Sequence, residues 1–242
     1  KNYYDEKFYT YNVGGSYRSA EKILRHLNDY ITKKSEFNSI VDFGCGRGTW
    51  LKAALELGVQ KAVGYDGDWN KDKIIDDRII FNSCDLRTIE PSGETFDIAI
   101  SLEVAEHLPK SSMHQIVNFL TSSSDVVIFG AAFPLQGGTD HINEQFPESW
   151  YQIFDHFGYC VVDLFRERFW DDEDIESCYR QNTFLYIRKN SDIYNSGLFK
   201  PMSNTSFMNC MHPDIYLRRS GRQIFTDFSY SFKQLLKRKG FK

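Results

Sequence analysis

Glu103, Glu106 and His107 place two carboxylates and an imidazole in one five-residue segment, EVAEH. Histidine titrates near neutral pH, so His107 could take the proton from a reacting hydroxyl group. In a helix the three side chains would share one face, and His141 from a distant loop could complete an octahedral Mg²⁺ or Mn²⁺ site. Alternatively, Glu106 and His107 only cap and orient the helix. The segment therefore predicts Glu106, His107 and His141 as catalytic residues, and these three with Glu103 as a candidate metal site.

His141 lies in a polar, glycine-rich segment, residues 134–145, after a predicted buried strand. A loop that encloses a substrate needs glycines and clustered polar groups, although any long glycine-rich loop carries some polar residues. A second polar and aromatic stretch, residues 168–182, precedes the last predicted strand, and an aromatic face there could lie under a sugar ring. Amide and carboxylate groups form the directional hydrogen bonds that distinguish sugar hydroxyls. We predict five substrate-binding residues: Asn143, Glu144, Gln145, Trp170 and Arg180.

Three alternating glycines, Gly44, Gly46 and Gly48, separate an apolar stretch from a helical pattern that begins at Thr49. Glycine is needed where a tight turn uses backbone angles that other residues avoid, and where a ligand lies against bare backbone. A dinucleotide-binding loop reads GxGxxG, whereas the shorter GxGxG spacing suits the sugar and amino-acid parts of S-adenosylmethionine (SAM). An ordinary strand-to-helix turn would explain the same glycines on their own.

The ends of the next apolar stretches support a nucleoside-binding site. Asp66 ends the second stretch, where a carboxylate can accept hydrogen bonds from both ribose hydroxyls. Asp85 follows the third stretch, where it could accept from the adenine amino group while Leu86 packs against the ring. A loop carboxylate or a helix cap is the alternative for Asp85. The fourth stretch ends at Ser101, so four strand ends occur in the order that ligand binding at the carboxyl edge of a doubly wound sheet requires.

Stretches of strand length alternate with stretches of helical period, which predicts an α/β fold with a parallel sheet covered by helices. Seven strands are expected, over residues 39–43, 61–65, 79–82, 96–101, 126–130, 160–165 and 183–187. Helices are expected over residues 19–33, 49–57, 114–121 and 149–157. The pattern is lost from about Asn190, where we expect a loop-rich extension that ends in a basic helix.

Of the 242 residues, 41% are hydrophobic and 26% are charged, as in an ordinary globular protein with one large core. We expect no membrane span, because no run of about 18 apolar residues occurs, and no signal peptide. Five scattered cysteines without CxxC spacing disfavour a disulfide framework and a zinc site. The net charge of −4 offers no general attraction to nucleic acid, and the basic residues from Lys233 onward are expected to form a solvated helix end.

These segments together resemble the successive motifs of class I SAM-dependent methyltransferases, over roughly residues 39–187. The resemblance implies a Rossmann-like seven-stranded sheet with its last strand antiparallel, helices on both faces, and in-line methyl transfer from SAM. We expect one domain, with a helical cap (1–38), a catalytic core (39–189) and a C-terminal extension (190–242). Arg18 or Ser19 could reach the SAM carboxylate, although a surface arginine and a helix-capping serine are the plainer interpretation. The implied cofactor-binding set is Gly44, Cys45, Gly46, Gly48, Asp66, Gly67, Asp85, Leu86, Ser101 and Glu103.

The order EVAEHLP, GG..HINEQFP..W and W...YRQN resembles a narrower group. These are O-methyltransferases encoded with glycosyltransferases for bacterial surface polysaccharides and for capsid glycans of large algal viruses. The resemblance implies a sugar hydroxyl in a glycan as acceptor, such as one on rhamnose, and a glycosyltransferase that is fused to the domain or works with it. Phe146 stands where tryptophan is more usual and Cys178 where an aromatic residue is expected, which leaves the sugar open. The chain lacks an initial methionine, so we expect it to come from a longer cytoplasmic polypeptide, in the host cytoplasm if viral.

Two other functions remain open. The EVAEH segment is also similar to the metal-binding motif of small-RNA 2′-hydroxyl methyltransferases and of quinone-ring O-methyltransferases, and it occurs in methyltransferases without a metal. An RNA ribose is therefore an alternative acceptor, which the acidic net charge disfavours. A non-catalytic SAM-binding scaffold is the third possibility, but its acceptor side should be eroded, whereas all the acidic and imidazole groups are present here. The expected cofactors are SAM and, as a candidate, Mg²⁺ or Mn²⁺.

Overall fold

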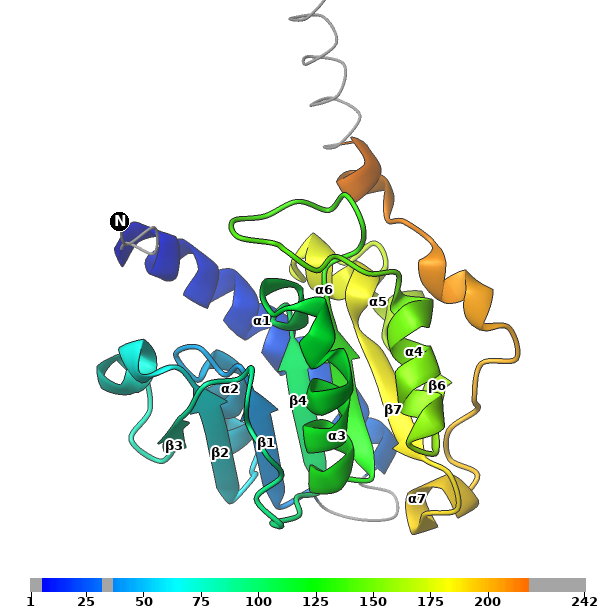
Figure 1. The fold of residues 1–242 in the computed structure, drawn as a ribbon, viewed down its shortest axis with the longest axis horizontal. Helices are drawn as coiled ribbons and strands as arrows, with labels where there is room; N and C mark the ends of the chain where they lie inside the picture. Colours follow the sequence, from blue (N-terminus) through cyan, green and yellow to red (C-terminus); the bar gives the residue numbers. More distant parts are fainter. Residues whose placement is uncertain (1–5, 32–36, 218–242) are drawn as a thin grey trace, which may run out of the picture.

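Seven short apolar stretches form the strands of one sheet, and helices pack on both of its faces (Figure 1). The computed structural model describes residues 6–31 and 37–217. Each strand corresponds to a predicted one, with bounds that differ by a few residues. The strands are β1 (Ser39–Phe43), β2 (Lys61–Asp66), β3 (Ile80–Ser83), β4 (Ile98–Leu102), β5 (Val126–Gly130), β6 (Tyr159–Val162) and β7 (Phe184–Arg188).

The strands lie in the order β3-β2-β1-β4-β5-β7-β6. Parallel pairs join β1 to β2 and β4, β2 to β3, and β4 to β5, whereas β7 is antiparallel to both β5 and β6. The predicted Rossmann-like sheet with an antiparallel last strand is therefore confirmed. The order reverses between β1 and β4, and ligands bind beside the carboxyl ends of strands at such a point.

The four predicted helices are present as α1 to α4, and the short helices α5, α6 and α7 were not predicted. α1 begins well before the predicted residue 19, because Gly14 and Gly15 are poor helix formers and hide the pattern. Residues 169–180, which fitted no regular pattern, include most of α6. None of the helices within residues 6–31 and 37–217 is long and apolar enough to cross a membrane. The helices are α1 (Glu6–Ile31), α2 (Thr49–Glu56), α3 (Met113–Ser123), α4 (Pro147–His156), α5 (Arg166–Phe169), α6 (Ser177–Asn182) and α7 (Asp192–Asn195), with 3₁₀ turns η1 (Asp68–Lys73), η2 (Ala105–His107), η3 (Lys110–Ser112) and η4 (Thr205–Asn209).

Two apolar layers hold the helices on the sheet, α1 and α2 on one face and α3 and α4 on the other. Side chains alternate along β4, so Ile98 and Ile100 pack toward α1 and α2, and Ala99 packs toward α3 and α4. Large side chains such as Leu27 and Trp150 are fully buried in these layers, and each contributes about 1.5–3 kcal/mol to stability. The strand ends therefore rest on a rigid support.

Beyond β7 the chain forms α7 and η4 and then passes outside α4 (Figure 1). Glu148 at the start of α4 accepts hydrogen bonds from Thr205 and Asn209, which hold η4 in place. The predicted loop-rich extension is thus partly helical up to residue 217. The basic helix predicted from Lys233 lies outside the described residues.

Candidate active site

The glycine-rich loop between β1 and α2 forms one wall of a cavity of about 420 Å³. Gly44 and Gly48 have positive φ angles of 86° and 82°, and a Cβ atom on them would lie 2.5 Å from Val104 and 2.6 Å from Ile79. Gly46, with φ 54°, would point its Cβ at open space. Two of the glycines are therefore needed for packing, and Gly46 leaves bare backbone that a ligand could lie against.

Asp66, at the end of β2, joins that strand to the glycine loop. Its carboxylate accepts hydrogen bonds from the N–H groups of Gly46 (2.7 Å) and Gly67 (2.6 Å). Burial raises the pKa of Asp66, and these two hydrogen bonds oppose the increase. Gly67 lies directly under the exposed ring of Trp69, because a Cβ there would be 2.1 Å from the ring. A carboxylate can accept more than these hydrogen bonds, so Asp66 can still accept from a ligand. The exposed aromatic ring of Trp69 beside it was not predicted.

Six of the predicted cofactor residues do not line the cavity: Gly48, Asp66 and Gly67, which lie beside the glycine loop, and Asp85, Leu86 and Ser101. Asp85 is exposed and pairs with the guanidinium of Arg87 (2.7 Å), which lowers the pKa of Asp85 to about 2. Leu86 packs against the α3 and α4 layer. Ser101 is fully buried, its hydroxyl has no hydrogen-bond partner, and its neighbours along β4 line the cavity instead. The roles of these residues toward SAM stay predictions.

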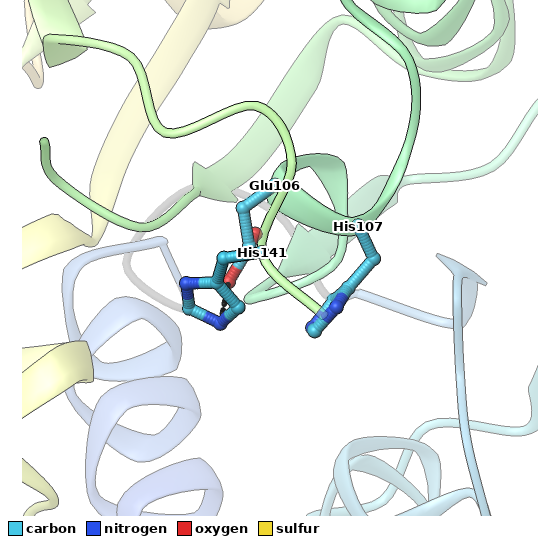
Figure 2. Close-up of side chains that lie close together, drawn as sticks. All are labelled: Glu106, His107 and His141. Carbon is cyan, nitrogen blue, oxygen red and sulfur yellow. Dashed lines mark ion pairs between the residues drawn. The ribbon is translucent and has the colours of Figure 1, made fainter. Parts of the chain in front are cut away.

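Glu106, His107 and His141 come together on the opposite wall, as Figure 2 shows. One ligand atom from each lies within 4.8 Å of those of the other two. The two imidazole rings are 4.9 Å apart and nearly perpendicular, and Nε2 of His141 is 4.0 Å from Oε1 of Glu106. Three of the four predicted metal ligands are thus adjacent to one another.

Glu106 and His107 have shifted pKa values. Glu106 is fully buried, and neither of its oxygens makes a well-formed hydrogen bond. Burial and the neighbouring Glu103 carboxylate raise its pKa well above the usual range. Burial and His141 lower the pKa of His107, which favours its neutral form. An unpartnered buried carboxyl beside a neutral imidazole fits a divalent cation, which would supply the missing partner.

Glu103 lines the same cavity but is not part of this group of possible metal ligands, and the predicted helical face is wrong. Its backbone adopts a left-handed conformation (φ 57°), and η2, which follows it, is a single 3₁₀ turn. A helix that would align Glu103 with Glu106 and His107 therefore does not form. The carboxylate of Glu103 accepts hydrogen bonds from Gln136 Nε2 (2.8 Å) and Asn182 Nδ2 (2.7 Å).

Glu144 orients His141. Its carboxylate accepts hydrogen bonds from the N–H groups of Leu135 (2.7 Å) and Gly137 (2.6 Å), and it lies 3.0 Å from Nδ1 of His141. Because a carboxylate only accepts, Nδ1 of His141 must carry the proton. The lone pair on Nε2 is then free on the side of Glu106.

Asn143 and Gln145 hold the loop in place. Asn143 is buried, its side chain donates to the carbonyl of Ala105, and Gln145 donates to Asn143. The backbone N–H groups of residues 142 and 143 both donate to the carbonyl of Glu106. These predicted substrate-binding groups are thus already bonded within the protein, and contact of Asn143 or Gln145 with a substrate stays a prediction.

Trp170 and Arg180 lie outside the cavity. Arg180 is buried and donates to the carbonyl of Trp170 (3.1 Å) and to the carboxylate of Asp214 (2.7 Å). The Trp170 ring packs 4.5 Å from that of His212. Arg180 lines a separate groove, and Trp170 fastens the extension to α6.

On α1, neither of the residues predicted to reach the SAM carboxylate, Arg18 or Ser19, lines the cavity. Arg18 is exposed, and Ser19 bonds to the carbonyl of Gly15 and to the N–H of Glu176, so Ser19 joins α1 to the start of α6. Ser16 lines the cavity instead. The one sequence signal for α6 was the polar run directly before the last strand. Residues that line the cavity outside the predicted sets include Ser16, Asp42, Trp50, Gln136, Glu176, Cys178 and Tyr179.

Residues 15–129 match a protein-family model described as a methyltransferase domain. A curated relative, the ribosomal RNA large subunit methyltransferase E of Methanococcus aeolicus, is 28% identical over 120 residues. The match takes in 50% of this chain and 37% of the relative, so the chain spans little more than a third of the relative's length.

Solved structures share the fold at low identity. CalS10, an amino pentose methyltransferase from Micromonospora echinaspora with bound SAM, has a TM-score of 0.55 at 15% identity, over 78% of this chain and 99% of its own. The small RNA methyltransferase HEN1 has a TM-score of 0.52 at 18% identity, over 73% of this chain and 25% of its own. Identities this low establish the fold and leave the acceptor open.

Proposed function

We propose that the chain is a class I SAM-dependent methyltransferase and that it methylates a hydroxyl group of a sugar in a glycan. The match of residues 15–129 to a methyltransferase-domain model and the order of the strands support the first part of this proposal. The bare backbone at Gly46 would receive the methionine part of SAM, and the carboxylate of Asp66 would receive the ribose. Bound SAM would supply a methyl group on a sulfonium, which is an excellent leaving group. The protein then has to align the acceptor oxygen and remove its proton.

His141 is the general base in this proposal, and its pairing with Glu144 is the observation that carries it. A carboxylate that holds one imidazole nitrogen in its protonated form leaves the other nitrogen as a proton acceptor. Nε2 of His141 is such an acceptor, and His141 lines the same cavity as the glycine loop. His107 lies beside it with a lowered pKa and is the alternative base.

A divalent cation is a candidate second cofactor. Glu106, His107 and His141 would hold it, and the unpartnered oxygens of Glu106 fit a cation. The ion would lower the pKa of an acceptor hydroxyl bound to it. His107 and His141 would then be ligands, and the proton would leave by another route.

A sugar is favoured over other acceptors by three observations. CalS10, which shares the fold with this chain over 99% of its own length, is an amino pentose methyltransferase. The HINEQFP and YRQN segments resemble those of glycan O-methyltransferases, for which a deoxyhexose such as rhamnose is the expected acceptor. The net charge of −4 does not favour a polyanion.

An RNA ribose hydroxyl is the second candidate. The ribosomal RNA methyltransferase of Methanococcus aeolicus and the small RNA methyltransferase HEN1 are both similar to this chain. A ribose hydroxyl needs the same proton removal as a hexose hydroxyl, so the cluster around His141 would serve either acceptor.

Labelled SAM, offered with rhamnosides, other glycosides and RNA, tests the proposal. Label should enter a glycoside and not RNA. Methylation of RNA alone would replace the sugar with the second candidate, and SAM binding without transfer to any acceptor would favour a scaffold. The reaction should be repeated after EDTA treatment and after Mn²⁺ or Mg²⁺ is restored. An unchanged rate after EDTA would remove the metal from the proposal and leave His141 or His107 as base.

A further inference from the structure

A groove of about 430 Å³ adjoins the cavity at the start of α6. Its lining residues are Glu173, Ile175, Glu176, Ser177 and Arg180, together with Asp214 and Leu217 from the C-terminal extension. Among the described residues, Glu176 alone lines both the cavity and the groove. A molecule in the cavity that is longer than one sugar could therefore continue past Glu176 into the groove.

The carboxyl group of Glu176 fits into a notch in α1. A Cβ atom at Gly15 would lie 2.1 Å from Oε1 of Glu176, so only glycine leaves room for this carboxyl group. The backbone N–H of Glu176 donates to Ser19, which fixes the residue against the helix. No hydrogen bond to the carboxyl oxygens of Glu176 occurs among the described residues. The carboxylates of Glu103 and Glu144 in the same region, by contrast, accept hydrogen bonds from other residues of the protein.

The charges of the groove select against a polyanion. Among the described residues that line it, three carry carboxyl groups, Glu173, Glu176 and Asp214, and one carries a guanidinium, Arg180. Asp214 already pairs with that guanidinium at 2.7 Å. Phosphate groups would be repelled here, whereas neutral hydroxyl groups could donate to the carboxylates. An uncharged saccharide therefore suits the groove better than RNA.

We propose that this groove binds the saccharide unit next to the methylated sugar, and that Glu176 accepts hydrogen bonds from hydroxyl groups of the acceptor. The inference rests on the proposed function, and it narrows the substrate to a neutral oligosaccharide. A disaccharide should then be a better acceptor than a simple glycoside of the same terminal sugar, because only the disaccharide occupies both spaces.

Steady-state kinetics with such a matched pair test this. The wild-type protein should show a higher kcat/KM for the disaccharide. Glu176→Gln should raise the acceptor KM about tenfold, the effect of losing one charge-assisted hydrogen bond, and should leave the SAM KM unchanged. Glu173→Trp, which fills the groove from an exposed position, should lower kcat/KM for the disaccharide more than for the glycoside. Glu167→Gln, an exposed glutamate on α5 outside both spaces, is the control and should change neither value.

The outcomes separate the two ideas. If sugars are methylated but the disaccharide has no advantage, or Glu176→Gln leaves the acceptor KM unaltered, the groove is not an acceptor subsite. A rise in the SAM KM alone would assign Glu176 to the cofactor and overturn the inference. If no saccharide is methylated at all, the proposed function fails and the subsite fails with it.

Discussion

The orientation of the His141 imidazole ring depends on the carboxylate of Glu144. Three donors converge on it, and two of them are backbone N–H groups that hold it still. Positioning of this kind ensures that the imidazole has one tautomer and one orientation before the substrate arrives. The identity of Glu144 should therefore influence the rate more than the binding of either substrate.

Glu144→Gln tests this at the residue scale. An amide can donate to Nδ1 and so favour the tautomer whose Nε2 carries the proton, which makes His141 unable to act as base. We expect kcat to fall by about 100-fold or more, with the SAM Kd unchanged. Glu21→Gln, which removes a surface ion pair with Arg25, should leave kcat as it is. Equal kcat values in wild type and Glu144→Gln would show that His141 is not the base.

Glu106 should make stability depend on pH. Its pKa in the folded protein is raised by burial and by Glu103, so the unfolded chain ionises first as pH rises above the ordinary glutamate pKa of 4.5. The free energy of unfolding is thus highest at low pH, where Glu106 is protonated in both states. It falls as pH increases toward the raised pKa, because only the unfolded chain then gains from ionisation. Without metal, Glu106→Gln should match wild type in Tm near pH 4 and exceed it by a few degrees near pH 7.

Calorimetry in EDTA at both pH values would measure this difference. Added Mn²⁺ should raise the Tm of wild type and not that of Glu106→Gln, because binding to the folded state alone stabilises it. A wild-type Tm that does not respond to Mn²⁺ would argue against the metal site. If the Tm difference between Glu106→Gln and wild type is the same at pH 7 as at pH 4, the pKa of Glu106 is not raised in the folded protein.

At the scale of elements, the glycine loop has two separable tasks. Gly44 is needed so that Val104 can pack, and Gly46 is needed so that the space above the loop stays open. Gly44→Ala should destabilise the fold by about 1–3 kcal/mol, because it combines backbone strain with a clash.

Gly46→Ala should fold, with a smaller loss of stability, and should lose SAM affinity. Gly158→Ala is the matched control, because Gly158 also has a positive φ angle and open space but lies before β6, at the opposite edge of the sheet. Thermal unfolding and SAM titration would compare the three variants. Wild-type SAM affinity in Gly46→Ala would place the cofactor elsewhere.

The elements were largely predictable from sequence, and the site was predictable only in part. Periodicity located all seven strands, and the spacing of Gly44, Gly46 and Gly48 located the loop. The cluster of Glu106, His107 and His141 could be anticipated because the residue types follow two adjacent parallel strands, β4 and β5. The left-handed backbone at Glu103 could not, since glutamate rarely adopts it.

Other details depended on contacts between segments far apart in sequence. Sequence does not reveal that the loop's own N–H groups bond to Glu144, or that Asn143 bonds to a carbonyl of η2. Contact of either residue with a substrate stays a prediction. Glu176 escaped attention because its position in the cavity depends on Gly15, more than 150 residues earlier in the chain. No local pattern records such pairings.

For the whole molecule, the balance of charge should separate a glycan acceptor from RNA. Binding to RNA releases counterions, so a protein that makes several phosphate contacts loses about 10³-fold or more in affinity between about 50 and 200 mM salt. The net charge is −4, and the described residues that line the groove beside the cavity include three acidic side chains and one basic side chain.

We therefore expect kcat/KM for a saccharide acceptor to change less than about twofold over the same salt range. Rates at several NaCl concentrations, with the glycoside from the acceptor panel, would measure this. A steep decline with salt would indicate a charged acceptor.

The segment between β5 and α4 is bonded mainly to itself. The N–H groups of Leu135 and Gly137 and the imidazole of His141 all meet at Glu144, and the backbone docks through one carbonyl, that of Glu106. Apart from the side chains of Gln136 and Asn143, which bond to residues outside it, this stretch contains its own hydrogen-bond partners. This stretch should therefore be exchangeable between related proteins as one unit, with new residues beside Glu106 and an unchanged glycine loop.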